Sequence, residues 1–286
     1  MSAYDGNPGT SHGASNLASG KGHKDENFPV ASWLIKPRHR PPILAFYRFA
    51  RAADDVSDHP TAAPDEKLRL LDEMERTLLG ELDSAVEARA LRNVLKEYGL
   101  SEQHAMLLLE AFRRDVVKLR YADWDELMDY CRYSAMPVGR FVLDVHGEDR
   151  ATWPASDALC AALQVINHLQ DCGKDYRALN RVYIPQDVFV DTEALGRTKA
   201  TPELLSAIAT LAKRNGGLLA QSRPFAGQIV DRRLALEVSL IQTFAEDLNA
   251  RLQNRDPLSG RVHHRKLELM PLAFRAWLGF LKRRRT

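Results

Sequence analysis

The sequence predicts an all-α protein with a single domain, and three observations lead to this fold class. Segments in which apolar residues recur with helical spacing follow one another along the chain with little interruption. Strand and helix patterns do not alternate, as they would in a protein built on a parallel sheet. The sequence also contains no glycine-rich phosphate loop and no internal repeat of fixed period. A bundle of helices around a shared core is therefore expected.

The composition is that of an ordinary globular protein and argues against several classes. The chain has 286 residues, 45% hydrophobic and 27% charged, which is enough to bury a sizeable core. A net charge of +2 argues against a nucleic-acid partner. Cys131, Cys160 and Cys172 match neither a metal-binding spacing nor a disulfide framework. No apolar run reaches the roughly 18 residues of a membrane span, and the N-terminus has no hydrophobic signal core, so a reduced, cytoplasmic protein is expected.

The N-terminal half of the chain is predicted to hold one unstructured segment followed by helices. Residues 1–25 are rich in Gly, Ser, Ala and Asn and are expected to be disordered, whereas residues 26–286 form the folded domain. Pro42 marks a helix start because proline suits the first helical turn. Ser101 is interpreted as a helix N-cap. The helices expected here span residues 42–58, 65–82, 85–98 and 102–119.

A further helix is predicted over residues 125–143, opened by Asp123 or Trp124. It contains Pro137 and Gly139, which should kink or loosen it. Small residues at this point would also let another helix or a ligand approach closely.

The C-terminal half is predicted to begin with a long helix that starts at Pro154. Residues 180–185 (Asn-Arg-Val-Tyr-Ile-Pro) are strand-like, and we interpret them as an extended loop. The remaining helices are expected over residues 202–219, 226–252 and 267–282.

Two pairs of carboxylates, each four residues apart, point to a function. Residues at i and i+4 share one face of a helix, so Asp54 and Asp58 point the same way, as do Asp171 and Asp175. Asn167 adds an amide oxygen one turn before Asp171. Carboxylates this close repel each other, and a dication between them would remove that cost. Ligands that are all carboxylate and amide oxygen favour Mg²⁺ or Mn²⁺ over Zn²⁺.

A single acidic pair at this spacing is usually only a solvated helix face. Here both pairs lie in apolar segments, with Phe46 and Phe49 before the first pair and Val165, Ile166 and Leu169 around the second. Acidic residues on otherwise buried helices need partners. We therefore predict two acidic helix faces that hold a diphosphate through bridging metal ions, because Mg²⁺ commonly binds substrate phosphates.

With these motifs the chain resembles the squalene and phytoene synthases, which share the all-α trans-isoprenyl diphosphate synthase fold, a helical bundle with a central active-site cavity. The resemblance extends over residues 26–266. Within the family the chain is similar to the bacterial hydroxysqualene synthases of hopanoid and squalene biosynthesis. The residues that carry this similarity are Glu26-Asn27-Phe28-Pro29-Val30-Ala31-Ser32, Arg40-Pro41-Pro42 and Arg181-Val182-Tyr183-Ile184-Pro185.

The resemblance implies a role for individual residues. The two aspartate-rich motifs of the family, whose Mg²⁺ ions bind and ionise the substrate diphosphate, fall on Asp54, Asp55, Asp58, Asn167, Asp171 and Asp175. Tyr130 corresponds to a tyrosine of the reaction cavity and is predicted to be catalytic together with the four paired aspartates. The positions expected to contact substrate are Asn27, Tyr47, Arg51, Gln164, Arg181 and Tyr183. For Arg181 and Tyr183, closure over the diphosphate and simple docking of their loop on the bundle are equally open.

The chain departs from the family at Gln170, where arginine or lysine often precedes the second acidic pair. One cation fewer then lies beside the diphosphate, and Lys174 is a candidate substitute. The reaction implied is ionisation of presqualene diphosphate, rearrangement of the cyclopropylcarbinyl cation and quenching by water. Aromatic residues that either wall the cation or simply fill the core are Phe28, Phe46, Tyr47, Tyr130 and Phe141. NADPH is not expected, although the lack of a dinucleotide fingerprint does not itself decide between water and hydride.

Two other functions stay open. A squalene or phytoene synthase would join two farnesyl or geranylgeranyl diphosphates head to head, and would need two substrate sites and, for squalene, NADPH. A non-catalytic isoprenoid-binding relative would typically have lost acidic residues that this chain keeps.

The C-terminal residues 274–285 are basic with an apolar face. They either form a packed terminal helix with a solvated basic end or rest on an anionic bilayer. The second alternative suits a C30 lipid product and predicts a cytoplasmic protein that is peripheral on the inner face of the membrane. Other enzymes of the squalene pathway, upstream and downstream, are the candidate protein partners.

Overall fold

The computed structural model describes residues 34–283, apart from the side chains of Lys266 and of residues 281–283, and its regular elements over this range are all helices. The predicted all-α fold class is confirmed. The segment 1–25 and the predicted substrate contact Asn27 lie outside the described residues.

The first helices follow the sequence prediction closely. A short 3₁₀ turn, η2 (Pro37–His39), leads into α1 (Arg40–Ser57). Three more helices follow, namely α2 (Pro64–Leu79), α3 (Val86–Tyr98) and α4 (Gln103–Val117). Helices α2 and α3 each end at a glycine with positive φ, 88° at Gly80 and 64° at Gly99, a backbone conformation that glycine adopts without strain.

The prediction of a single helix over residues 125–143 is wrong, because the chain forms two helices there. They are α5 (Trp124–Ser134) and α6 (Met136–His146). Asp123 caps α5 by accepting a hydrogen bond from the Glu126 amide at 2.9 Å. The break falls at Ala135, and Pro137 lies in the first turn of α6, where its missing N–H is no loss. The predicted kink is thus a complete helix boundary.

Helix α7 (Trp153–Leu179) is the longest in the described chain and is preceded by η3 (Arg150–Thr152). Residues 180–185 then form an irregular loop, as predicted, and η4 (Thr192–Gly196) follows.

The C-terminal helices are α8 (Pro202–Ser222), α9 (Phe225–Gln228), α10 (Arg232–Leu252) and α11 (Lys266–Arg283). The prediction of one helix over residues 226–252 is wrong. Ile229 is extended, and the Asp231 carboxylate accepts hydrogen bonds from the amides of Arg233 and Leu234, so that α10 begins anew.

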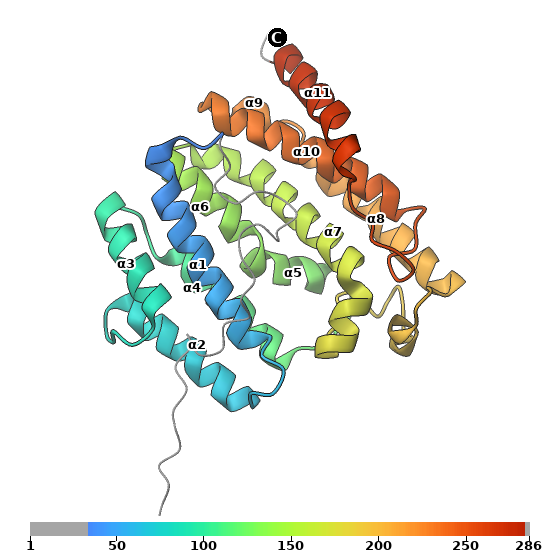
Figure 1. Cartoon of the computed structure of the whole chain (residues 1–286), viewed down its shortest axis with the longest axis horizontal. Coiled ribbons are helices and arrows are strands. Elements are labelled where there is room, and N and C mark those ends of the chain that lie inside the picture. Colours follow the sequence, from blue (N-terminus) through green and yellow to red (C-terminus); the bar gives the residue numbers. More distant parts are fainter. Residues whose placement is uncertain (1–33, 284–286) are drawn as a thin grey trace, which may run out of the picture.

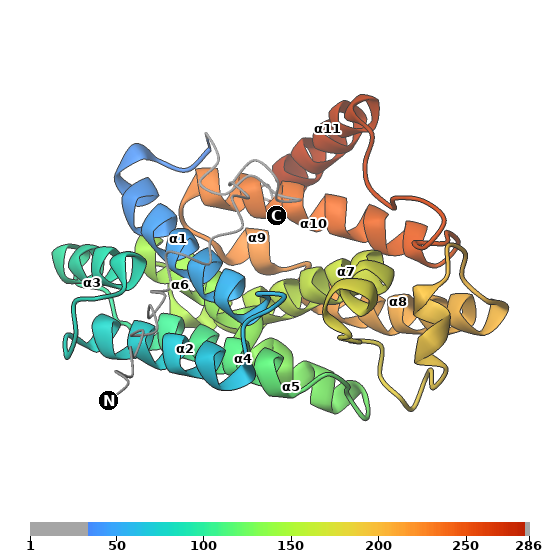
Figure 2. The same cartoon turned by 60° about the horizontal axis from the view of Figure 1, so that its bottom comes forward.

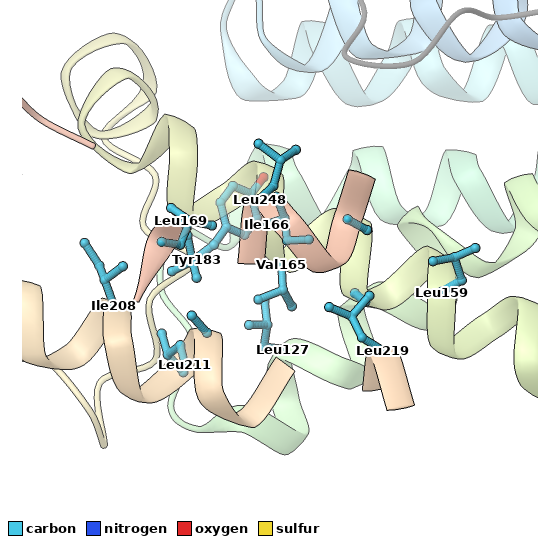
Figure 3. Close-up of a cluster of buried hydrophobic side chains, with 14 of the residues drawn as sticks. Leu127, Leu159, Val165, Ile166, Leu169, Tyr183, Ile208, Leu211, Leu219 and Leu248 are labelled. Carbon is cyan, nitrogen blue, oxygen red and sulfur yellow. The ribbon is translucent and has the colours of Figure 1, made fainter. Parts of the chain in front are cut away.

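The helices form two packed groups with α7 at the centre of the larger one. Figure 1 shows α2 and α3 outside α1 on one side, and α8, α10 and α11 beyond α7 on the other. The smaller core fills the space between α1, α2, α3 and α4, where Phe46 stacks on Phe141 at 4.0 Å between ring centroids. The larger core surrounds α7, and Figure 3 shows Val165, Ile166 and Leu169 of this helix within it.

Small residues allow α7 to pack closely against its neighbours. A Cβ added at Gly139 of α6 would lie 2.5 Å from Ser156 Oγ, and one added at Gly173 would lie 2.4 Å from a methyl carbon of Leu258. Gly139 therefore permits the close helix approach that the sequence predicted. None of the described helices combines the length and the apolar character needed to cross a bilayer.

Candidate active site

The first acidic motif occupies the last turns of α1. Arg51 donates to the carboxylates of both Asp54 and Asp55, each over 2.6 Å. The side chain of Asp55 is buried, whereas Asp54 keeps 34% of its surface exposed. Acidic groups at a helix C-terminus face the negative end of the helix dipole, so helix stability does not explain their presence.

The second motif lies near the C-terminal end of α7. Asn167 is exposed, and Asp171 and Asp175 are partly buried on the following turns. The Lys174 ammonium lies 3.7 Å from Asp171, and its role as a substitute for the missing arginine stays a prediction. Asp175 lies close to the C-terminal end of α7, where negative charge is disfavoured, whereas Asp171 lies about two turns before that end.

Arg181 links the two motifs, because its side chain donates to Asp58 over 2.9 Å and its backbone amide donates to the Asp175 carbonyl over 3.3 Å. Asp54 has its pKa raised to about 7 by burial and then by the neighbouring Asp58. Burial and then Asp171 raise the pKa of Asp175 to about 7, and Asp58 adds to this effect from the other motif. Asp58 thus contributes to the electrostatics of both acidic pairs, although burial and the partner aspartate within each pair contribute more.

This cluster has the chemistry of a divalent-cation site. Its side chains offer carboxylate oxygens and the amide oxygen of Asn167, which hard cations prefer. Burial is the main reason why the pKa values of Asp54 and Asp175 are raised, and the neighbouring aspartate in each pair adds to it. A dication fits this arrangement because it would stabilise the ionised form of both groups.

Arg181 joins the first motif to the interior of the bundle. Its Nη1 donates to Asp58 Oδ1 over 2.9 Å, and its Nη2 donates to the backbone carbonyl of Asp115 over 2.9 Å. Only 5% of Arg181 is exposed. The loop 180–185 is therefore docked on the bundle, which is the second of the two arrangements left open by the sequence.

Sequence reasoning did not identify Asp115, which is at the base of the site. This buried carboxylate accepts a hydrogen bond from the Tyr130 hydroxyl at 2.7 Å and another from the Tyr183 hydroxyl at 2.9 Å. Burial raises its pKa to about 6. One signal was present in the sequence, because the helical register with Leu108 and Ala111 puts Asp115 on the buried face of α4.

His168 belongs to the same cluster of aromatic rings. It stacks on Tyr183 with 3.5 Å between the ring centroids and 16° between the planes. Burial lowers the pKa of His168 to about 3, so the imidazole is neutral at physiological pH. The cluster of Asp115, Tyr130, His168, Arg181 and Tyr183 is called the inner network below.

The other predicted contacts lie on the same helices. Tyr47 is half-buried one turn before Arg51, and Gln164 is half-buried one turn before Asn167. The Gln170 amide donates to the Val262 carbonyl, so this side chain points toward the segment that follows α10.

Comparison with known proteins then decides the family. A sequence model of the squalene/phytoene synthase family matches residues 21–268. The chain belongs to this family. The resemblance identified from the two acidic motifs is thereby confirmed.

Relatives within the squalene/phytoene synthase family are close in sequence. A hydroxysqualene synthase of Rhodopseudomonas palustris is 56% identical over 95% of this chain and 94% of its own. A hydroxysqualene synthase of Zymomonas mobilis is 55% identical over 94% of this chain and 92% of its own. Among solved structures, the squalene synthase HpnC from Alicyclobacillus acidocaldarius is 32% identical, covers 84% of this chain and 91% of its own, and superposes with a TM-score of 0.69.

These relatives match the subgroup to which the sequence pointed. Membership of the squalene/phytoene synthase family identifies the chain as an enzyme that acts on a prenyl diphosphate with the help of a divalent metal ion.

Proposed function

We propose that the protein is a hydroxysqualene synthase that ionises presqualene diphosphate with Mg²⁺ and quenches the rearranged cation with water, giving hydroxysqualene and diphosphate. The observation that carries the proposal is the identity of 55–56%, over more than nine tenths of the chain, to two hydroxysqualene synthases. The two acidic pairs, to both of which Asp58 contributes electrostatically, agree with a substrate that carries a diphosphate.

In this proposal the metal ligands are Asp54, Asp58, Asn167, Asp171 and Asp175. Mg²⁺, or Mn²⁺ in its place, would neutralise the charge that develops on the leaving diphosphate. NADPH has no role in the proposed reaction, because water ends it.

The cationic side chains bind and orient the leaving group. Arg51 and Lys174 lie beside the first and second motif and supply hydrogen-bond donors to phosphate oxygens. Arg181 holds Asp58, and Tyr47 and Gln164 contact the substrate from the preceding turns of α1 and α7. Asn27, the remaining proposed contact, lies outside the described residues.

In this proposal Tyr130 and Tyr183 stabilise the carbocation and shield it from water. Their rings lie 5.5 Å apart between centroids, and both are buried. The faces of aromatic rings carry negative charge, which favours a cation and keeps water away until the rearrangement is complete.

The test is a product analysis with the purified full chain and Mg²⁺. Presqualene diphosphate is supplied in one reaction and farnesyl diphosphate in another, each with and without NADPH. A C30 alcohol from presqualene diphosphate that is unaffected by NADPH and absent with farnesyl diphosphate is the expected result. If the folded protein forms no product in any of these reactions with Mg²⁺ present, the proposal is contradicted and the isoprenoid-binding alternative is favoured.

A second candidate is a synthase that condenses two prenyl diphosphates. The observation that favours it is the solved relative of 32% identity, which is named a squalene synthase. Coupling of farnesyl diphosphate in the product analysis would select this function.

We also propose that the enzyme works in the cytoplasm, peripherally on the inner face of the membrane. Helix α11 packs on α10 along one side (Figure 2). The side chains of Met270, Phe274 and Trp277 share another face and are 77%, 59% and 45% exposed. The sequence then continues with Lys282-Arg283-Arg284-Arg285. An apolar face beside basic residues suits an anionic lipid surface, where the other enzymes of the pathway would supply substrate and take product.

A further inference from the structure

Asp115 has an unusual set of partners for a carboxylate. Both of its oxygens accept hydrogen bonds from phenols, Oδ2 from Tyr130 and Oδ1 from Tyr183. Its side chain is only 5% exposed. A buried carboxylate is costly even with two phenol donors and the Arg181 guanidinium 3.7 Å away, and an apolar residue of similar size would often serve stability as well. Its presence therefore calls for a function.

The contacts of Asp115 fix where two hydroxyl protons point. Each phenol has a single O–H, and an ionised carboxylate can only accept. Tyr130 and Tyr183 therefore both donate to Asp115 and donate to nothing else at the same time. The oxygen of Tyr183 also accepts a hydrogen bond from Arg181 Nη1 at 3.4 Å, so Asp115 and Arg181 together fix the orientation of this phenol.

The same residue also holds the arginine of the site. Arg181 Nη2 donates to the Asp115 carbonyl, and Arg181 Nε lies 3.7 Å from Asp115 Oδ1. The other end of the guanidinium reaches Asp58 of the first acidic motif. Asp115 is thus connected through one side chain to the proposed metal site and through two others to the proposed cavity wall.

Packing around the inner network limits other arrangements. His168 stacks on the ring of Tyr183, and Tyr121 stacks on the same ring with 5.6 Å between centroids and 22° between planes. With its neighbours so close, the hydroxyl of Tyr183 is directed by Asp115 and by the rings on either side of it.

We propose that Asp115 is a positioning residue of the enzyme, whose carboxylate orients the hydroxyls of Tyr130 and Tyr183 and the guanidinium of Arg181 for the ionisation and quenching steps. The proposal rests on the proposed function of the site. Asp115 acts through these three residues and does not itself touch the substrate.

Asp115→Asn tests this with little change of shape. The asparagine amide donates where the carboxylate accepted, so at most one phenol keeps its direction and the other must turn. Because small misplacements of reacting groups are costly, we expect kcat for diphosphate release to fall on the order of 100-fold. KM for substrate and the half-saturating Mg²⁺ concentration should stay near the wild-type values, because the metal ligands are untouched. The share of hydroxysqualene among the C30 products should also change.

Asp157→Asn is the matched control. Asp157 also forms a half-buried ion pair, with Arg140 Nε at 2.8 Å, and it lies on α7 about 21 Å along the helix axis from Asp171. This variant loses a structural ion pair without touching the inner network. Its kcat and product ratio should remain those of the wild type.

A folded Asp115→Asn variant with the kcat and product ratio of the control would overturn the proposal. If the variant fails to fold, Arg181→Lys and Tyr183→Phe replace it, since each removes one contact of Asp115 and leaves the carboxylate. Unchanged kcat and product ratio in both would equally overturn it. Diphosphate release is measured with whichever prenyl diphosphate the wild type turns over, so a failure of the hydroxysqualene assignment is recognised separately from a failure of this one.

Discussion

At the scale of residues, each acidic pair holds one aspartate whose pKa is raised, chiefly by burial and then by the other aspartate of the pair. Asp54 and Asp58 lie in the last turn and at the C-cap of α1, where negative charge is disfavoured, and Asp175 lies close to the C-terminal end of α7. Two of them, Asp54 and Asp175, have a pKa raised to about 7. Such a cost is understandable where a ligand of opposite charge is bound during the working cycle.

Removal of one acid from either pair should abolish turnover. For Asp54→Ala and Asp171→Ala we expect the rate of diphosphate release to fall by at least about 100-fold, because charge stabilisation of the leaving group is lost. Circular dichroism should show an unchanged helical fold. Asp83→Ala, which removes an exposed partner of Arg92, serves as the control and should retain the wild-type rate. Turnover that survives both site changes would mean that the metal site is wrongly assigned.

The raised pKa values predict how pH affects the metal-free protein. Asp54 and Asp175 titrate near pH 7 when folded and near pH 4 when unfolded, so between these values the folded state binds more protons. The free energy of unfolding should therefore fall as pH rises from about 4 to about 7 through these two groups. Urea unfolding at pH 5, 6 and 8 measures this.

Mg²⁺ should restore the free energy of unfolding that is lost as pH rises, because it binds the ionised carboxylates. We expect the rise in melting temperature on adding Mg²⁺ to be larger at pH 8 than at pH 6. The double variant Asp54→Asn, Asp175→Asn should show neither the pH effect nor its reversal. An equal Mg²⁺ effect at both pH values in the wild type would contradict the assignment.

At the scale of elements, the position of α7 decides the position of the second motif. Close contact with α6 depends on Gly139, where any side chain would meet Ser156 and Cys160. Gly173 likewise allows close packing near the acidic end of the helix, where a side chain would meet Leu258 and the Leu195 carbonyl. Both glycines are needed for the space they leave, since neither has a positive φ.

Gly139→Ala should destabilise the protein by about 1–3 kcal/mol, because the added methyl forces α6 away from α7. Gly217→Ala in α8 is the control, since nothing lies within 4 Å of the added atom. There alanine should be neutral or stabilising by up to about 1 kcal/mol, because it favours a helix over glycine. Chemical denaturation of both variants gives the comparison, and equal effects of the two changes would refute this role of Gly139.

At the scale of the whole molecule, α11 packs on α10 and α9 and leaves Met270, Phe274 and Trp277 exposed. Its aromatic pair, Phe274 and Trp277, lies 5.9 Å apart between ring centroids. Figure 1 shows the helix at the outer edge of the bundle, next to α10. A surface with this chemistry at the periphery is accessible to a membrane.

Deletion of residues 282–286 should weaken binding to vesicles that contain anionic lipid, since each basic residue near such a surface contributes about 1 kcal/mol. Trp277→Ser should weaken binding to the same vesicles by removing apolar contact. Neutral vesicles are the control and should show a much smaller effect of the deletion. Co-sedimentation that is unaltered by both changes would exclude membrane contact through this helix.

Much of this architecture was predictable from local patterns. The starts of α1, α7 and α8 follow from proline in the first turn, and α2 to α4 follow from amphipathic spacing. Pro137 and Gly139 predicted a kink but not the complete break at Ala135, and the break before Asp231 was not predicted at all. An apolar period that continues across a break does not show where one helix ends.

The sequence alone determined the fold class, the family and the two acidic pairs, because helical periodicity and i, i+4 spacing are local properties of the chain. Only the tertiary structure decided that Asp58 and Asp175 act on one another, and that Asp115 accepts from Tyr183, a residue 68 positions away. Such contacts join different elements, and their geometry depends on how the helices pack. No spacing along the chain encodes it, which is why the inner network emerged only from the folded bundle.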